Sequence, residues 1–338
     1  MREPIQVAGP FFEDFEVGQV FDDAPGLTLT DGHAAAHQAI AGDRLRLALD
    51  GPLCQAVTGS ERRLAHPALV CDVAIGQSTG PTERVRGNLF YRGLVLLRPV
   101  FIGDTLRTRT EVVGLKQNRR RVDGVATGLV ALRITTRDQD GGPVLDFWRC
   151  PMIPLRDPDA ETGHAGRFED IPAEADRARV RGAAPDRWRL EGLRTEGPGG
   201  ALAGLAPGAV FEVQARETVT AATELARLTL NVARAHTDAG GSAYGRRLVY
   251  GGHTISVAAA HATRALPALA TIVAWRGCDH TGPVFEGDAL STGLTVEATD
   301  PLPGGGGLVD LRAVVRAERE GTDDAVPVLD WRFVALMG

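Results

Sequence analysis

Pro99-Val-Phe-Ile-Gly-Asp-Thr-Leu106 recurs as Pro283-Val-Phe-Glu-Gly-Asp-Ala-Leu290, and this repeat decides how the chain is built. Pro143-Val-Leu-Asp146 recurs as Pro327-Val-Leu-Asp330 at the same offset of 184 residues. Self-similarity at a fixed spacing indicates a duplicated structural unit. Residues that build the common fold should recur in both copies. Residues present in one copy only therefore show where to look for a single functional site.

The repeats divide the chain into two units joined by a polar segment. The first unit covers residues 1–154 and the second covers residues 204–338. Residues 155–203 between them are rich in Asp, Glu, Arg, Pro and Gly, which is typical of a linker. We expect this linker to lie over the surface of the protein, with one short helix at 173–181.

Both units show the same order of predicted elements. A Thr-rich turn leads into a helix, an irregular loop follows, and a helix rich in Ala and Val comes next, at 68–78 and at 253–266. Alternating and β-branched residues then predict strands at 88–96, 105–114, 125–135 and 143–153, and at 270–277, 288–298, 307–316 and 327–335. The shared Gly103-Asp104 and Gly287-Asp288 are predicted to form turns. A buried helix followed by antiparallel strands is an α+β unit whose sheet wraps around the helix, so we predict a double hot-dog fold.

The composition excludes several classes of protein. At 338 residues, with 43% hydrophobic and 24% charged residues, the chain suits two globular domains. A formal net charge of -6 argues against a nucleic-acid partner, and the basic run Asn118–Arg121 is predicted to be a solvated turn, with a phosphate contact as the alternative. The first residues lack the apolar core of a signal peptide and no apolar run is long enough for a membrane span. We expect a cytoplasmic protein with no membrane partner.

The cysteines and histidines do not form a metal-binding pattern. The four cysteines show no close pairing, as expected of a reduced protein. Cys278 and His280 lie at a ligand-like spacing, but no second pair accompanies them, so we predict no metal site. His33, His37 and His164 have no partner motif and receive no role.

The two copies differ most where a loop leads into the buried helix. The second copy has Asn231 and His236 in this loop, whereas no histidine occurs in the corresponding stretch of the first copy, at 46–52. The second copy then opens its helix with Gly251 and Gly252, and the residue of the first copy that corresponds to Gly251 is Pro67. Proline has no backbone N–H, so the first copy lacks the donor that Gly251 offers.

These differences have chemical content. Bare N–H groups at a helix start, backed by the positive end of the helix dipole, suit a thioester carbonyl that becomes an enolate. A loop histidine transfers protons near neutral pH. Each feature also has a structural explanation, since a loop histidine is commonly a hydrogen-bonding residue and Gly-Gly commonly a turn. Their coincidence in one copy favours the addition or removal of water next to a thioester, while His253 and His261 are expected to pack along the helix.

The residues also resemble those of MaoC-type hydratases. Phe12-Glu-Asp-Phe-Glu-Val-Gly18 is similar to the start of such domains, and Asn231 and His236 have the spacing of the family's catalytic Asp and His. Tyr244-Gly-Arg-Arg-Leu-Val-Tyr-Gly-Gly-His253 and Val328-Leu-Asp-Trp331 resemble the double hot-dog branch that includes mesaconyl-CoA hydratases. The likeness covers nearly the whole chain. It departs from the wider family at Asn231, because an amide cannot exchange a proton as a carboxyl group does.

The resemblance implies a hydro-lyase for a branched dicarboxylic 2-enoyl-CoA, of the mesaconyl-CoA to β-methylmalyl-CoA type. His236 would be the general base, Asn231 would hold the water, and Gly251 and Gly252 would polarise the thioester carbonyl. The candidate substrate-binding residues are Arg234 for a second carboxylate, Arg246 and Arg247 for phosphates, and Tyr250 and His253 beside the glycine pair.

The resemblance further implies no cofactor, because coenzyme A is part of the substrate, and it allows a homodimer. The first copy would be a degenerate partner. Three alternatives stay open at this stage: a hydratase of itaconyl-CoA or of a monocarboxylic enoyl-CoA, a non-catalytic acyl-CoA-binding protein, and a hot-dog thioesterase. The thioesterase is disfavoured because no carboxylate is ready in the loop to act as the catalyst.

Overall fold

The computed structural model describes residues 4–5, 7–119, 124–319, 321 and 324–338. The prediction for the run Asn118–Arg121 falls partly on residues 120 and 121, which lie outside the described residues. Among the residues described, no helix is both long enough and apolar enough to span a membrane.

The first unit contains four α-helices and six strands within its described residues, besides the 3₁₀ helices η1 (Phe12–Asp14) and η2 (Gly80–Thr82). The α-helices and strands are β1 (Val20–Phe21), β2 (Leu27–Thr28), α1 (Asp31–Ala41), α2 (Arg46–Leu49), α3 (Gly51–Thr58), α4 (Pro67–Gln77), β3 (Gly87–Leu96), β4 (Thr105–Gln117), β5 (Thr127–Arg137) and β6 (Pro143–Pro154). The short helices α2 and α3 occupy part of the predicted irregular loop. Asp50 explains where α3 begins, because its side chain accepts the Leu53 N–H at 2.9 Å and Pro52 pre-sets the first turn.

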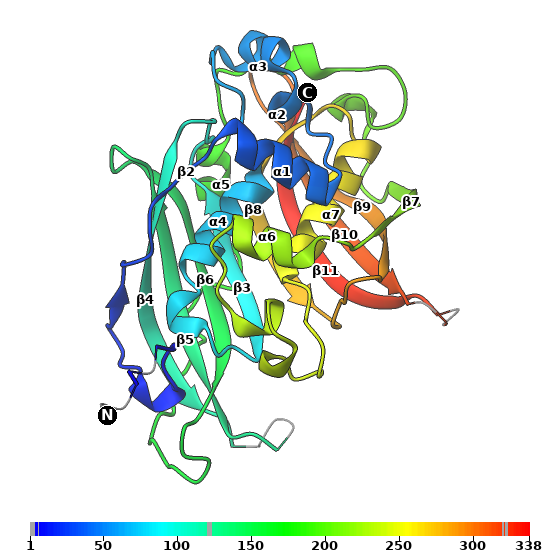
Figure 1. Cartoon of the computed structure of the whole chain (residues 1–338). Helices are drawn as coiled ribbons and strands as arrows, with labels where there is room; N and C mark the ends of the chain where they lie inside the picture. The colour runs from blue at the N-terminus through cyan, green and yellow to red at the C-terminus, as the bar shows by residue number, and fades with distance from the viewer. Residues whose placement is uncertain (1–3, 6, 120–123, 320, 322–323) are drawn as a thin grey trace.

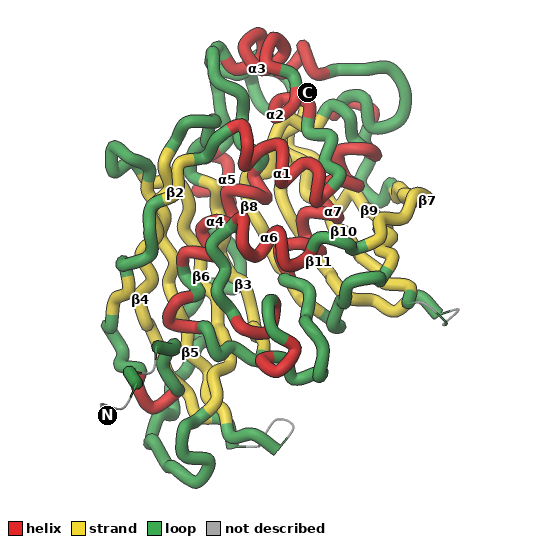
Figure 2. Tube along the Cα trace, viewed as in Figure 1, coloured by secondary structure: helices red, strands yellow, loops and turns green. Residues whose placement is uncertain are grey.

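The second unit repeats this order with one long outer strand and a longer central helix. Its elements are β7 (Val210–Thr218), α6 (Ala222–Leu228), α7 (Gly251–Ala265), β8 (Leu269–His280), β9 (Ala289–Pro301), β10 (Gly307–Glu318) and β11 (Val326–Met337). The segment between α6 and α7 contains only the short 3₁₀ helices η5 (Arg234–His236) and η6 (Ala239–Gly241) and is otherwise loop (Figure 2).

All the long strands belong to one antiparallel sheet. Its order is β1-β4-β5-β6-β3-β8-β11-β10-β9-β7, with β2 beside β4, so the units join where β3 pairs with β8. The helices α1, α4, α6 and α7 gather over the middle of this sheet (Figure 1), and α4 packs against α7. The prediction of an α+β double hot-dog fold is confirmed: two helix-wrapping sheets are fused edge to edge.

The central helices are buried because their sequences leave almost nothing to solvate. Every residue of α4 is buried, and Asp72 is its one charged residue. In α7, burial runs from Gly252 to Thr263 without interruption. A helix apolar on all sides is stable only inside a core, so the two helices are held by the sheet and by each other.

The linker differs from the expectation of a segment lying over the surface. It carries α5 (Arg177–Ala183), and it buries Val180, Trp188, Leu190 and Leu193 in the main core. Arg177 pairs with Asp310 of β10 at 2.7 Å, and Arg179 pairs with Asp146 of β6 at 2.7 Å. The linker therefore fastens the two units together, since its arginines reach strands of both.

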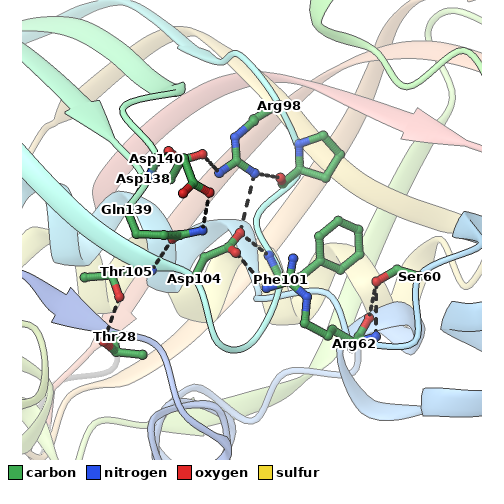
Figure 3. A network of polar contacts seen from close by, with 11 residues as sticks. Thr28, Ser60, Arg62, Arg98, Phe101, Asp104, Thr105, Asp138, Gln139 and Asp140 are labelled. Carbon is green, nitrogen blue, oxygen red and sulfur yellow. Dashed lines mark hydrogen bonds and ion pairs between the residues drawn. The ribbon is translucent and has the colours of Figure 1, made fainter.

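The repeated Gly-Asp pairs form tight turns that are held in the same way. Gly103 has a φ of +102° and Gly287 a φ of +93°, which only glycine adopts without strain. Asp104 accepts hydrogen bonds from Arg62 at 2.7 Å and from the Phe101 N–H at 3.1 Å (Figure 3). Asp288 likewise accepts the Phe285 N–H at 2.9 Å. These pairs shape the sheet of each unit.

Candidate active site

A cavity of about 340 Å³ lies where the two units meet. The second unit contributes the α6–α7 loop, the start of α7 and the end of β8, and the first unit contributes the end of α4 with β3 and β6. Its polar lining residues are Thr79, Arg86, Asn88, Tyr91, Arg149, Asn231, His236, Tyr244, Tyr250, Thr254, His280 and Thr281. The volume is at the small end of the range for ligand pockets, so it suits an acyl group better than a whole nucleotide.

The loop that carries Asn231 is held tightly by the first unit. A Cβ at Gly76 of α4 would overlap the Thr229 carbonyl, so only glycine allows α4 to approach this closely. The Val232 N–H donates to the Thr79 hydroxyl at 3.0 Å. Leu230 has a φ of +62°, an uncommon value for a leucine, and strained backbone of this kind concentrates at functional sites.

Asn231 lines the cavity with its side chain fixed at one end. Its Oδ1 accepts the Ala233 N–H at 3.0 Å. This assignment of the amide oxygen directs the NH₂ group away from that bond, where it has no protein partner among the described residues. Asn231 is thus a preoriented donor at the cavity wall.

His236 lines the same cavity, and its tautomer follows from one hydrogen bond. Its Nδ1 lies 2.9 Å from the Leu248 carbonyl oxygen, which can only accept, so Nδ1 carries the proton and Nε2 is a free base. Burial lowers the pKa of His236 below its ordinary value, although the Leu248 carbonyl acts in the opposite direction. The ring is therefore neutral near pH 7, as a general base must be.

The start of α7 leaves its backbone donors open. The side chain of the N-cap residue Tyr250 makes no capping hydrogen bond, and the N–H groups of Gly251 and Gly252 have no acceptor in the described parts of the chain. Gly251 lines the cavity, whereas Gly252 faces Asp72 of α4, whose Oδ1 a Cβ there would overlap. The geometry thus favours Gly251 over Gly252 as a donor to a ligand.

Sequence reasoning did not select several cavity residues, and three of them are His280, Tyr91 and Arg149. His280 was considered only as half of a metal pair, yet it lies against the helix start, where a Cβ on Gly251 would come within 2.6 Å of its ring. Burial of the ring lowers the pKa of His280 to about 4, and repulsion between its charged form and His236 acts in the same direction. No group of three or more possible metal ligands occurs in the described residues.

The other two of these three residues, Tyr91 and Arg149, come from the first unit. At the repeat offset, Leu96 corresponds to His280, Trp275 to Tyr91 and Phe333 to Arg149. Comparing the copies at every position, and not only around the loop, would have found all three.

Five of the predicted site residues do not line the cavity. Arg234 is half-exposed and lies 3.9 Å from Asp238, and Arg247 pairs with Glu286 at 2.5 Å. Arg246 stacks on Phe285. Gly252 and His253 are buried behind the cavity wall, and burial lowers the pKa of His253 to about 4. Their proposed contacts with substrate stay predictions.

Several known proteins have sequences similar to this chain. The family described as mesaconyl-CoA hydratase matches residues 2–268. The chain is 31% identical to the mesaconyl-CoA hydratase of Cereibacter sphaeroides, covering 94% of this chain and 92% of that one. It is 29% identical to the β-methylmalyl-CoA dehydratase of Chloroflexus aurantiacus, covering 97% of each.

Solved structures show the same fold. A conserved hypothetical protein of Mycobacterium tuberculosis, described as a double hot-dog, is 49% identical over 99% of this chain and 100% of that one, with a TM-score of 0.89. A putative MaoC domain dehydratase of Chloroflexus aurantiacus is 28% identical over 99% of each chain, with a TM-score of 0.86.

Proposed function

The chain belongs to the mesaconyl-CoA hydratase family, and from that premise we propose that it reversibly adds water to a branched, dicarboxylic 2-enoyl-CoA. It is a hydro-lyase, as its named relatives are. The observation that carries the proposal is His236, whose ring is fixed through Nδ1 so that a free Nε2 remains at the cavity.

In the hydration direction, His236 Nε2 takes a proton from water and the oxygen of that water attacks the β-carbon of the enoyl group. The electron pair of the double bond moves onto the thioester carbonyl, giving an enolate. The Gly251 N–H would donate to this oxygen at the positive end of α7. The α-carbon then takes a proton from the His236 imidazolium, which restores the free base.

Asn231 has a defined part in this sequence. Because its Oδ1 already accepts the Ala233 N–H, the NH₂ group is left to donate to the oxygen of the attacking water. That donation points a hydrogen of the water toward His236 and lowers the entropy cost of the attack. The proton transfer itself falls to His236, since an amide does not titrate.

The outer end of the cavity offers groups suited to the coenzyme A portion. Tyr244 lines the cavity, is 52% exposed and packs edge-on against Phe285. Arg246 lies over the ring of Phe285, with its guanidinium carbon 3.4 Å from the ring centroid. An exposed arginine beside a cavity mouth is well placed to pair with phosphate oxygens.

A panel of acyl-CoA thioesters tests the proposal. Water addition removes the conjugated double bond, so turnover is followed by loss of enoyl-thioester absorbance with mesaconyl-, fumaryl-, itaconyl- and crotonyl-CoA. We expect the highest kcat/KM with mesaconyl-CoA. Preference for crotonyl-CoA would replace the substrate by a monocarboxylic one, and silence across the whole panel would overturn catalysis in favour of an acyl-CoA-binding protein.

A further inference from the structure

Arg149 stands apart from the other arginines that the structure describes. It lies on β6, is 3% exposed and lines the cavity from the side of the first unit. No other described arginine is buried. A guanidinium is expensive to remove from water, so its position needs an explanation.

The hydrogen bonds of Arg149 use two of its five N–H donors. Nη2 donates to the Ser78 carbonyl at 2.7 Å and to the Thr82 hydroxyl at 2.8 Å. Neither Nε nor Nη1 has a partner within the described part of the chain. The neutral acceptors fix the plane of the guanidinium and leave Nη1 free to donate to a ligand.

No carboxylate of the described residues forms an ion pair with Arg149. Arginines at the surface of this protein mostly have such a partner, as Arg133 and Arg312 do with Asp146 and Asp330. Burial lowers the pKa of Arg149, but a guanidinium keeps its proton in proteins. The cavity is thus lined by a full, uncompensated positive charge.

The fold does not require an arginine at this position. In the sheet, Arg149 of β6 is opposite Tyr91 of β3, and in the second unit the corresponding register pair is Phe333 opposite Trp275. Both aromatic residues of that pair are buried in the core. Since the same sheet is built with an apolar pair, the polar pair in the first unit has a purpose other than packing.

The surroundings of Arg149 add a further hydrogen-bond donor. Tyr91 and Tyr250 line the same cavity, but the buried Tyr250 hydroxyl interacts with the Asp72 carboxyl, which leaves Tyr91 as the donor. Burial raises the pKa of Tyr91, so its hydroxyl keeps its proton and can donate. The Tyr91 phenol and the Nη1 group of Arg149 together offer donors to an anion with two oxygens.

We propose that Arg149 binds the second carboxylate of the acyl group and so selects dicarboxylic thioesters, an inference that rests on the proposed function for the identity of the reacting bond. In a 2-enoyl chain of four carbons this carboxylate is bonded directly to the carbon that the water attacks. Arg149 and His236 line one small cavity, so a substrate held by the first presents that carbon to the second. The first unit supplies specificity and the second unit supplies the base.

Binding of a matched, unreactive pair of ligands tests the inference. Succinyl-CoA and butyryl-CoA both carry four-carbon saturated acyl groups and differ only by a terminal carboxylate in place of a methyl group. By calorimetry we expect the wild-type protein to bind succinyl-CoA ~100-fold more tightly, as a charge-assisted hydrogen bond inside a buried cavity allows. Arg149→Gln should reduce this preference to less than ~5-fold, because the amide keeps a donor but loses the charge.

Arg133→Gln is the matched control, since Arg133 lies on the neighbouring strand β5, is half-exposed and pairs with Asp146. It should keep the full preference. A wild-type preference near one, or an unchanged preference in a folded Arg149→Gln protein, would overturn the inference. Should that variant not fold, a crystal structure of the wild-type protein with succinyl-CoA decides: a carboxylate bonded to Arg149 supports it, and one placed elsewhere, including beside Arg86, rejects it.

The same ligands separate this inference from the proposed function. Neither contains a double bond, so their binding does not depend on catalysis. A protein that prefers succinyl-CoA yet hydrates no enoyl thioester would retain the role of Arg149 and lose the proposed reaction. A protein that hydrates mesaconyl-CoA without preferring succinyl-CoA would do the reverse.

Discussion

The cavity of the second unit has a closed counterpart in the first. At the repeat offset, Pro67, Leu96 and Val100 correspond to Gly251, His280 and Val284, and they line a void of about 10 Å³ against 340 Å³ for the open site. So small a void is at the limit for even one water molecule. Ala183 and Pro185 of the linker close it from outside. Duplication has left one site open and one filled.

The two helix starts show why only one of these places can bind a carbonyl. In the first unit, Pro67 has no N–H, and His66 Nδ1 accepts the Ala68 N–H at 3.1 Å. In the second unit, the corresponding donors of Gly251 and Gly252 stay open. The first unit has no free N–H group to offer a ligand at its helix start, because one is absent and the next is hydrogen-bonded by the protein. The second unit leaves the corresponding N–H groups free.

In the loops before these helices, it is the first unit that has the acid, whereas the second unit has an amide. Gly42 and Leu230 both have a left-handed φ, and the next residue, Asp43 or Asn231, accepts the N–H two residues on, at 3.0 Å in each case. The first unit thus has a carboxylate in the local geometry of Asn231, where it pairs with His66 at 3.0 Å. The second unit keeps the histidine and the cavity but has an amide.

Replacing His236 in the open site should have the largest effect on activity. His236→Ala should lower kcat/KM for mesaconyl-CoA by ~10³–10⁴-fold, because no described carboxylate lines the cavity to take over the proton transfer. The far-ultraviolet circular dichroism should stay unchanged, since the ring makes one hydrogen bond to a carbonyl. His164→Ala, outside the cavity, is the matched control. A His236→Ala enzyme that keeps most of its activity would show that the open site is not catalytic.

Giving α7 the proline that begins α4 should have the next largest effect on activity. Proline is tolerated at the first position of a helix, as Pro67 shows, so Gly251→Pro removes one donor while α7 still forms. We expect kcat to fall ~10²–10³-fold, the usual loss for one oxyanion donor. Stopped-flow absorbance under single-turnover conditions measures this step.

Gly251→Ala provides the control for the added bulk. Its Cβ would also press on the His280 ring, at 2.6 Å, but the N–H remains. If the alanine variant loses as much kcat as the proline variant, then crowding of His280 explains both losses, and the backbone donor has no part in the reaction.

Exchanging the loop amide for the acid of the first unit should change the pH profile more than the rate. In Asn231→Asp, a carboxylate beside His236 favours the imidazolium and raises the histidine pKa. Hydration needs neutral His236, so kcat/KM should begin to fall at a higher pH than in the wild type, whose His236 pKa is lowered by burial. Above that range the two rates should agree within ~10-fold. An identical acid limb in both proteins would show that the limb does not report His236.

How much of the site could be predicted depended on how far each residue lies, along the sequence, from a recognisable motif. The repeat predicted both sheets, and the contrast between Gly251 and Pro67 predicted the helix start, because each lies within a few residues of its motif. Arg149 was missed because it reaches the cavity from a strand of the other unit, and Arg234 was preferred because it lies in the same loop as the histidine. Proximity in sequence does not give side-chain direction: Arg234 points to solvent, whereas Arg149 is held inward by the Ser78 carbonyl.

Replacing Asp43, the acid of the closed site, should have the smallest effect on activity, but it should lower the stability of the protein. Burial alone would raise the pKa of Asp43, but His66 and the Leu45 N–H outweigh it, so the pKa lies below the ordinary 3.8. A lowered carboxyl pKa contributes stability that is present above the unfolded value and disappears as the pH falls through the folded value.

Asp43→Asn should therefore lower the free energy of unfolding at pH 7 by ~1–3 kcal/mol, because His66 keeps a neutral acceptor but loses a charged one. The difference from the wild type should shrink when urea unfolding is repeated at pH 3, below the ordinary carboxyl pKa, because the contribution of a lowered pKa decreases there. The kcat/KM for mesaconyl-CoA should stay the same, since Asp43 does not line the open cavity. If activity falls while stability does not, then the closed site still takes part in the reaction, and the division of labour between the two units is wrong.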